Sequence, residues 1–504
     1  MNLTTTQQRI VDTNGNLVVS ASAGTGKTHT LVAKIAKELS QNQNQKVIAA
    51  ITFTIKAAKE IRDRLSIDTG NSFIGTNNSF AIEEVIMPFI KDAFGKNFDI
   101  KMTIDYQRSF GDFNEGLKLI TEESIIGKYN DNKKNFIFEL ALKVLTKSEV
   151  ARLYLRAKYF KIYVDEYQDC DENMHDFFMY LTNNLNINLF LVGDDKQALY
   201  IWRGARPEIF ANLLENSSFN SMHLEENFRS NKQIQNYGNV LFDQTTGLYE
   251  RQDNLSHINL VECTWSNWQE KLRNFWHEDS TSVLLRTKNT DAKENANELV
   301  ENDMNFKFVP RPPIAEIANS TTWIYYSIAQ YVMINTYSIY DFIYDIPYST
   351  QQNKNQKSII KKYLDNIIKF ITSKEKFFKA VIDFINFLGY ESQLSDLERL
   401  YTTLLHSEFK DAFLQNQYKH RAMTCHAVKG LQFDQVIIFA EDFSFNYNGD
   451  LHKYYVAVTR AKNQLIIIDT STFRSRHNLS NLENLLQTRK LNINELLTVI
   501  PDNI

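Results

Sequence analysis

A glycine-rich stretch ending in lysine and threonine is the clearest chemical signal in the sequence. It reads Ala21-Ser22-Ala23-Gly24-Thr25-Gly26-Lys27-Thr28 and leads through His29 into a helical pattern. Glycines let backbone N–H groups surround phosphate oxygens, and a helix N-terminus adds partial positive charge. We therefore expect a phosphate-binding loop, with Lys27 at the β- and γ-phosphates of a nucleoside triphosphate and Thr28 on Mg²⁺. Ala21 replaces the first glycine of the strict pattern, and an ordinary glycine-rich turn is the alternative interpretation.

Two adjacent carboxylates form the second signal. Asp165 and Glu166 follow an apolar, strand-like run that ends at Val164. Asp165 suits contact with Mg²⁺, and Glu166 suits polarisation of an attacking water. Side-by-side carboxylates repel each other unless a cation is present. Alone, such a pair is equally a solvated acidic turn, but its combination with the Lys27 loop favours phosphate chemistry.

A third stretch, from residue 192 to 205, combines an amide with aromatic rings. Gln197 is placed to hydrogen-bond to a γ-phosphate or an attacking water, and Tyr200 and Trp202 stand two apart beside Arg203. Aromatic faces that stack on nucleic-acid bases contribute ~1–3 kcal/mol per base. The alternative interpretation is that both rings belong to the hydrophobic core.

Alternating strand and helix patterns must position these residues. We expect strands over 16–21, 46–52, 160–164 and 188–192, and a second set over 222–224, 258–261, 283–286, 435–439 and 465–469. This alternation is typical of an α/β fold with two parallel sheets, whose chemistry lies at the carboxyl ends of the strands. Residues 76–154 and 311–419 interrupt the sheets and have mainly helical patterns.

Composition limits the remaining possibilities. The chain has 504 residues and a formal net charge of −4, so contact with DNA requires a local basic groove rather than overall charge. Its three cysteines, Cys170, Cys263 and Cys425, form no CxxC pair, which argues against a zinc site and fits a reducing cytoplasm. No signal peptide or apolar run of the ~20 residues needed for a membrane span is visible.

Together, these motifs resemble those of the UvrD/Rep/PcrA-like branch of superfamily 1 helicases, in the same order and along nearly the whole chain. The resemblance implies two RecA-like P-loop NTPase domains with helical insertions. Domain 1A would comprise residues 1–75 and 155–219, and its insertion 1B residues 76–154. Domain 2A would comprise residues 220–310 and 420–504, and a reduced insertion 2B residues 311–419.

The resemblance also assigns roles to individual residues. Gln7 would read the adenine edge, Phe228 would pack on the base, and Arg229 and Arg460 would contact the transferring phosphoryl group. Gln432 stands where the family usually has a ribose-binding Glu. With Mg²⁺ on Thr28 and Asp165, the implied ATP site comprises Gln7, Ala21, Ser22, Ala23, Gly24, Thr25, Gly26, Lys27, Thr28, His29, Phe228, Arg229, Gln432 and Arg460. The catalytic residues among these and the preceding motifs are Lys27, Asp165, Glu166, Gln197, Arg229 and Arg460.

For single-stranded DNA, the resemblance implies contacts along a groove that passes the aromatic motif. Asn78 replaces the usual His of one of these motifs. The implied DNA-binding residues are Phe53, Thr54, Asn78, Tyr200, Trp202, Arg203, Thr424 and His426.

A closer resemblance is to the helicase-like subunits of Gabija anti-phage systems, carried by residues 75–80, 88–95, 160–169 and 200–205. It implies a partner nuclease of the OLD family with a TOPRIM domain, a hetero-oligomer and activation by DNA ends. Two functions remain open: a 3′-to-5′ DNA-unwinding ATPase, and a DNA-end sensor that regulates the nuclease with little unwinding. The complete set of catalytic residues argues against a third, a non-catalytic DNA-binding scaffold.

Overall fold

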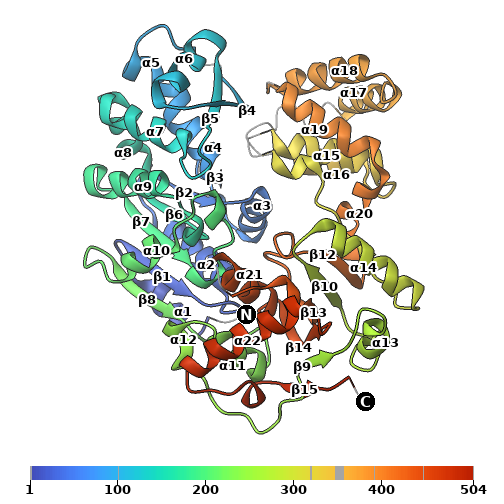
Figure 1. Ribbon diagram of the computed structural model, residues 1–504. Coiled ribbons are helices and arrows are strands. Elements are labelled where there is room, and N and C mark those ends of the chain that lie inside the picture. The colour runs from blue at the N-terminus through green and yellow to red at the C-terminus, as the bar shows by residue number, and fades with distance from the viewer. Residues whose placement is uncertain are drawn as a thin grey trace.

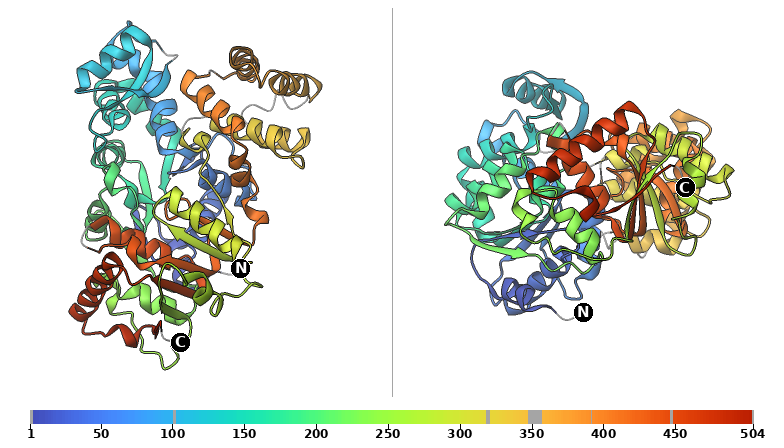
Figure 2. Two further views of the ribbon diagram at one scale, coloured as in Figure 1. Left: turned by 45° about the vertical axis from the view of Figure 1, so that its right-hand side comes forward. Right: turned by 60° about the horizontal axis from the view of Figure 1, so that its bottom comes forward.

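Two parallel β-sheets and two insertions make up the chain (Figure 1). The computed structural model describes residues 3–99, 102–317, 321–346, 357–390, 392–445 and 448–502. Figure 2 shows from a second direction that the insertions extend from the same side of the two sheet domains. Within these ranges, none of the helices has the length and apolar character needed to cross a lipid bilayer.

The first sheet has six parallel strands in the order β3-β2-β6-β7-β1-β8. Its strands are β1 (Leu17–Ala21), β2 (Val47–Thr52), β3 (Phe73–Thr76), β6 (Tyr159–Val164), β7 (Asn188–Gly193) and β8 (Asn220–Leu224). Its helices are α1 (Thr5–Asp12), α2 (Lys27–Gln41), α3 (Ile55–Arg64), α9 (Glu172–Leu185) and α10 (Pro207–Leu214). The central strands are almost wholly buried because helices cover both faces of a parallel sheet.

The first insertion contains helices and one pair of strands. Its elements are α4 (Asn77–Ala81), the π-helical turn η1 (Ile82–Ile86), α5 (Met87–Phe94), β4 (Thr103–Phe110), α6 (Phe113–Glu123), β5 (Ile125–Tyr129), α7 (Phe136–Lys147) and α8 (Glu149–Lys158). The parallel β4–β5 pair was not foreseen in this stretch. The hydrophobic core of the insertion is continuous with one side of the first sheet, so the insertion is anchored to that sheet.

The second sheet has seven parallel strands in the order β11-β12-β10-β13-β14-β9-β15. These are β9 (Ile258–Glu262), β10 (Ser282–Arg286), β11 (Lys307–Phe308), β12 (His420–Thr424), β13 (Phe433–Phe439), β14 (Ala461–Asp469) and β15 (Thr498–Ile500). Its helices are α11 (Lys232–Asn239), α12 (Asp243–Thr246), α13 (Trp268–Arg273), α14 (Asn289–Glu301), α21 (Asn448–Val458) and α22 (Phe473–Thr488).

One strand was assigned to the wrong sheet. The segment 222–224 was expected with the second set of strands, but β8 pairs with β1 at the edge of the first sheet. Its register joins Ala21 to Leu224, and the chain enters the second sheet domain only after this strand. The sheet that a short apolar run joins depends on distant partners, which local periodicity does not report.

The second insertion is helical throughout its described residues. It comprises α15 (Thr322–Met333), α16 (Ile339–Asp345), α17 (Lys357–Lys369), α18 (Lys374–Phe387), α19 (Leu394–Leu405) and α20 (Lys410–Phe413). These helices enclose a hydrophobic core of their own. The insertion is therefore a separate packing unit, joined to the second sheet domain at both of its ends.

Candidate nucleotide cleft and nucleic-acid groove

The predicted phosphate-binding loop has backbone geometry that only glycine adopts easily. Gly24 and Gly26 have φ angles of 80° and 81°, and α2 begins at Lys27 directly after them. A Cβ on Gly26 would lie 2.8 Å from Gln7 Nε2, and one on Gly24 would lie 2.8 Å from Arg229 Cβ. The loop is thus in close contact with both α1 and a segment that leads into the second sheet domain.

Gln7 uses its side chain inside the protein. Its Nε2 donates a hydrogen bond to Thr25 O at 3.2 Å, and its Oε1 accepts one from Thr4 N at 3.0 Å. The residue is only 4% exposed. In this structure Gln7 therefore ties the start of α1 to the phosphate-binding loop, and its expected contact with adenine stays a prediction.

The two predicted carboxylates lie against the loop at the end of β6. Lys27 Nζ is 3.5 Å from Glu166 Oε1, and Glu166 has a φ of 56°, which is uncommon for a residue with a side chain. Burial and the charge of Glu166 raise the pKa of Asp165 to about 7. Burial opposes ionisation of Glu166 too, but the charges of Lys27 and Lys429 lower its pKa below the usual value. Asp165 is therefore the carboxylate whose ionised form a bound cation would favour.

Thr28 and Asp165 fit a Mg²⁺ site only in part. The described residues contain no group of three or more His, Cys, Asp or Glu side chains that could hold a metal ion. Mg²⁺ is commonly bound by one or two protein oxygens together with substrate phosphates and water. The raised pKa of Asp165 and the single hydroxyl of Thr28 are compatible with that arrangement.

A chain of hydrogen bonds runs from the carboxylates to the second sheet domain. Gln168 Nε2 donates to Glu166 Oε2 at 2.5 Å, and Asp194 N donates to Gln168 Oε1 at 3.0 Å. Gln197 Nε2 donates to Asp194 Oδ2 at 2.7 Å, and Arg460 Nη2 donates to Gln197 Oε1 at 2.9 Å. The expected residues Glu166, Gln197 and Arg460 therefore belong to one network. Gln168 was missed, although its place inside the acidic motif was the available signal.

Arg229 and Arg460 lie together on the other side of the cleft. Arg229 donates from Nη1 to Thr459 O at 2.9 Å and from Nε to Gln432 Oε1 at 3.1 Å. Burial, and then repulsion from Arg229, lower the pKa of Arg460 below its usual value. Within the described part of the chain, neither guanidinium has a carboxylate within ion-pair distance. A buried and a partly exposed guanidinium group of this kind are suited to the oxygens of a polyphosphate.

The segment that carries Arg229 also contacts the loop directly. Phe228 N donates a hydrogen bond to Gly24 O at 3.0 Å, whereas the Phe228 ring is 55% exposed. Among the remaining residues expected in the ATP site, the buried His29 Nε2 has no hydrogen-bond partner in the described structure. These positions bring both sheet domains to one phosphate-binding loop.

Lys429 is a functional candidate that the residue-by-residue analysis missed. Its Nζ lies 2.5 Å from Asp169 Oδ2 and 3.3 Å from Glu166 Oε2. Lys429 lies in the turn after β12, whereas both carboxylates follow β6, so the ion pairs join the two sheet domains. Its occurrence in the string 424–434 was the only sequence signal, because its partners are more than two hundred residues away.

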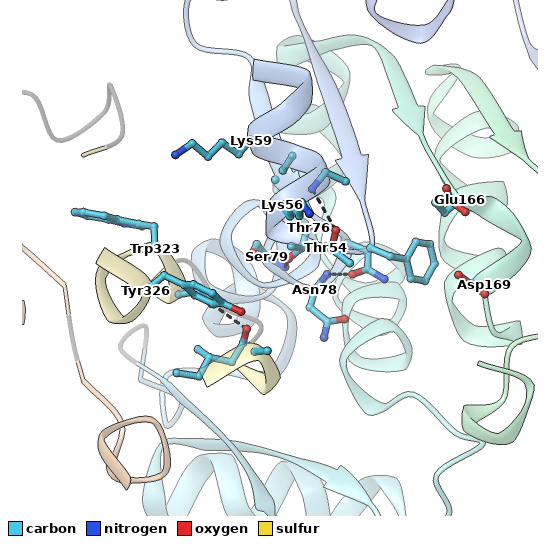
Figure 3. A pocket seen from close by; sticks show the side chains of 18 of the residues that line it. Thr54, Lys56, Lys59, Thr76, Asn78, Ser79, Glu166, Asp169, Trp323 and Tyr326 are labelled. Carbon is cyan, nitrogen blue, oxygen red and sulfur yellow. Dashed lines mark hydrogen bonds between the residues drawn. The ribbon is translucent and has the colours of Figure 1, made fainter. Parts of the chain in front are cut away.

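A groove of about 1610 Å³ lies between the sheet domains and the insertions (Figure 3). It is lined by seven of the eight predicted DNA-binding residues, namely Phe53, Thr54, Asn78, Tyr200, Trp202, Arg203 and His426. Thr424 is not among the lining residues. Trp202 is 53% exposed, and the guanidinium of Arg203 lies 4.5 Å from its ring centroid. Asn78 Nδ2 donates to Tyr106 OH at 2.9 Å, so its side chain is tied to β4 within the first insertion.

The groove is locally basic although the chain is acidic overall. Burial lowers the pKa of His426, and the charges of Lys453, Arg311, Arg203 and Lys429 lower it further. Four cations therefore act on one side chain in the groove. Such a local positive field attracts a polyanion regardless of the net charge.

Comparison with known proteins agrees with this geometry. Residues 3–141 and 132–218 match the UvrD/REP helicase N-terminal domain, and residues 419–468 match the UvrD-like helicase C-terminal domain. The chain belongs to the UvrD-like helicase family. Its α/β fold and its family, both predicted from the motifs, are confirmed.

Individual relatives narrow the comparison. The chain is 40% identical to the Gabija protein GajB of Bacillus cereus (strain VD045), over 92% of this chain and 94% of that protein. It is 27% identical to a probable DNA helicase II homolog of Mycoplasma capricolum over 58% of this chain, and 25% identical to the ATP-dependent DNA helicase Rep of Escherichia coli over 49%. These matches cover 49% and 44% of the two helicases, about half the length of each.

Proposed function

We propose that this chain is an ATPase whose hydrolysis depends on bound DNA, and that it serves as the motor-like subunit of an anti-phage complex of the Gabija type. The observation that carries the proposal is the convergence of two domains on one loop. Lys27 and the Asp165–Glu166 pair come from the first sheet domain, and Arg229 and Arg460 lie beyond it in the chain. The proposed division into 1A, 1B, 2A and 2B follows the two sheets, with the 1A–2A boundary shifted past β8.

The geometry supports a role for each residue. When bound, ATP with Mg²⁺ supplies the transferable phosphoryl group and a divalent charge at Thr28 and Asp165. Lys27 would bind the phosphates, and Glu166, ionised at neutral pH, would accept a proton from the attacking water. Arg229 and Arg460 would neutralise charge that develops during transfer, since their planar guanidinium groups match phosphate oxygens.

Coupling to DNA rests on the shared elements of cleft and groove. Lys429 lines the groove and contacts Glu166, while Gln197 precedes the Tyr200–Arg203 segment by only a few residues. A DNA strand that displaces Lys429 or the Tyr200–Arg203 segment would alter the positions of Glu166 and Gln197. Domain closure driven by nucleotide would in turn change the affinity for the DNA strand. A ligand shifts a conformational equilibrium only when it binds the two conformations with different affinity. By family resemblance the proposed direction of movement is 3′ to 5′.

The similarity to GajB supports the proposal of a partner. We infer a hetero-oligomer with a GajA-like nuclease of the OLD family that carries a TOPRIM domain, and recognition of single-stranded DNA or DNA ends. The second candidate function is a DNA-end sensor whose hydrolysis regulates that nuclease with little unwinding. The reduced second insertion expected from the resemblance, together with the similarity to GajB, is the reason for keeping this candidate.

Measurement of ATP turnover with and without single-stranded DNA tests the proposal. We expect DNA to stimulate turnover, Lys27→Ala to abolish it, and Trp202→Ala to weaken DNA binding while basal turnover is retained. Turnover that is indifferent to DNA, or that survives Lys27→Ala, would contradict the proposal. A strand-displacement assay on the same preparation separates the two candidates, since robust unwinding by the isolated chain excludes the sensor.

A further inference from the structure

Helix α15 has a second face that is only partly buried against the core of the insertion and borders the groove. Ile324, Tyr325, Ile328 and Ala329 are buried in the core of the second insertion. Trp323, Tyr326, Ser327 and Gln330 instead line the groove. The spacing of the second set is i, i+3, i+4 and i+7, which is one continuous stripe of a helix. Two aromatic rings one turn apart thus face a groove that the family motifs line from the other walls.

The two rings are held in place by aromatic neighbours. Trp323 contacts Phe342 and Tyr390, with ring centroids 6.2 and 6.0 Å apart, and the contact with Tyr390 is edge-to-face. Tyr326 contacts Phe413 edge-to-face at 6.0 Å. These contacts restrict the rings without stacking on them, because a stacked pair would lie nearly parallel. Figure 3 shows Tyr326 directed toward Asn78 and Ser79 and Trp323 directed the opposite way, below Lys59, with both residues on the side away from Glu166 and Asp169.

Trp323 also has an unused hydrogen-bond donor. Its Nε1 is buried and has no partner in the described structure. A buried N–H without an acceptor is unfavourable, so a shift of the ring that brings this donor to an acceptor in the groove would be favoured. Base carbonyl and ring nitrogen atoms are acceptors of this kind, and so are phosphate oxygens.

The opposite wall supplies positive charge. Lys56 and Lys59 of α3 line the same groove. Lys56 is exposed, so its ammonium group is accessible to an anionic partner in the groove. Lys59 forms an ion pair with Asp345 at 2.6 Å across the groove, and Asp345 also accepts a hydrogen bond from Tyr337 at 2.7 Å. Asp345 therefore keeps a partner if Lys59 turns to a phosphate.

We infer that Trp323 and Tyr326 form a nucleobase-binding subsite for single-stranded DNA, with Lys56 and Lys59 holding the adjoining phosphates. The inference rests on the proposed function, since it extends the strand beyond Trp202 along the same groove. A nucleic acid strand fits better than an apolar peptide because ring faces alternate with cations across one channel. The second insertion then increases the length of single-stranded DNA that the protein contacts.

Binding of oligothymidylates of increasing length to the full chain, measured by fluorescence anisotropy, tests the subsite. Trp323→Ala and Tyr326→Leu should each weaken binding of long oligonucleotides by at least about fivefold and leave the shortest bound oligonucleotides unaffected. Trp323→Phe should lie between Trp323→Ala and the unmodified chain. Tyr340→Ala is the matched control, because Tyr340 is a 67% exposed aromatic residue of the same insertion outside the groove.

Photocrosslinking of the unmodified chain to bromodeoxyuridine-substituted oligonucleotides avoids any dependence on variant folding. We expect crosslinked peptides from 321–333 in addition to the segment that contains Trp202. Crosslinks confined to the Trp202 side, together with binding of long oligonucleotides by Trp323→Ala as tight as by the unmodified chain, would overturn the subsite and leave the proposed function intact. Absence of any binding by the unmodified chain, in contrast, would overturn the proposed function first.

Discussion

Lys429 offers the sharpest test of how the two sheet domains are held together. Its ammonium group lies 2.5 Å from Asp169 and 3.3 Å from Glu166, and the Asp169 side chain is 0% exposed. Lys429→Met keeps an apolar stem of similar length and removes only the charge. Asp169 would then be a buried carboxylate without its cation, whereas Glu166 would keep Lys27 at 3.5 Å.

The expected cost follows from that burial. Removal of one partner from a buried ion pair typically destabilises a protein by ~3–5 kcal/mol, because the remaining charge stays uncompensated. Burial already raises the pKa of Asp169, and loss of Lys429 raises it further. When the pKa of a carboxyl group is higher in the folded than in the unfolded state, the folded protein loses stability as the pH rises through the folded-state pKa. The variant should therefore be closest to the parent in acid and weakest in mild alkali.

Urea denaturation of the chain at about pH 5 and about pH 8 measures this difference through the linkage of protonation to unfolding. Lys453→Met is the control, because Lys453 is 27% exposed and pairs with Asp450 three residues before it. That change should cost less than ~1 kcal/mol at either pH. Adding Asp169→Asn to Lys429→Met should recover much of the loss at alkaline pH. If Lys429→Met behaved like Lys453→Met at both pH values, the buried bridge between the domains would be refuted.

Three further predictions concern the cleft and the groove. Gly24→Ala should abolish nucleotide binding in a filter assay, since its Cβ would collide with the Arg229 segment, whereas Gly15→Ala at nearly the same φ meets no atom within 4 Å and should leave binding normal. Arg460→Lys keeps the positive charge but loses the guanidinium group that contacts Gln197. DNA-stimulated ATP turnover should therefore fall by about 10³-fold in a steady-state assay. A variant that turns over ATP at the parental rate would show that Arg460 has no part in the mechanism. His426 has a lowered pKa that DNA phosphates would raise, so DNA affinity should increase as the pH falls through the bound-state value and then level off. Anisotropy titrations of His426→Gln across the same pH range should show a flatter profile, and an unchanged slope would assign the effect elsewhere.

Local motifs were enough to predict where phosphate chemistry would lie. The Gly24–Lys27 turn, the Asp165–Glu166 pair and the Trp202–Arg203 segment are each set by neighbours within a few residues. The first two follow the ends of β1 and β6, and the third lies in a helical turn within the connection after β7. The parallel α/β fold was likewise readable, because buried strands in such sheets are short, apolar and separated by helices. The UvrD-like family followed from the order of these motifs along the chain.

Long-range packing decided the rest. No local signal in the sequence indicated that β8 pairs with β1 or that the Gln7 amide forms hydrogen bonds with Thr4 and Thr25. None indicated that Lys429 forms an ion pair with Asp169. The aromatic stripe of α15 was hidden for the same reason, since Trp323 resembles a core residue until the opposite wall is in place. The sequence determines which chemical groups are present and the local backbone conformation around each motif. Their charges and hydrogen bonds gain partners only when distant segments fold together, so those partners had to come from the tertiary structure.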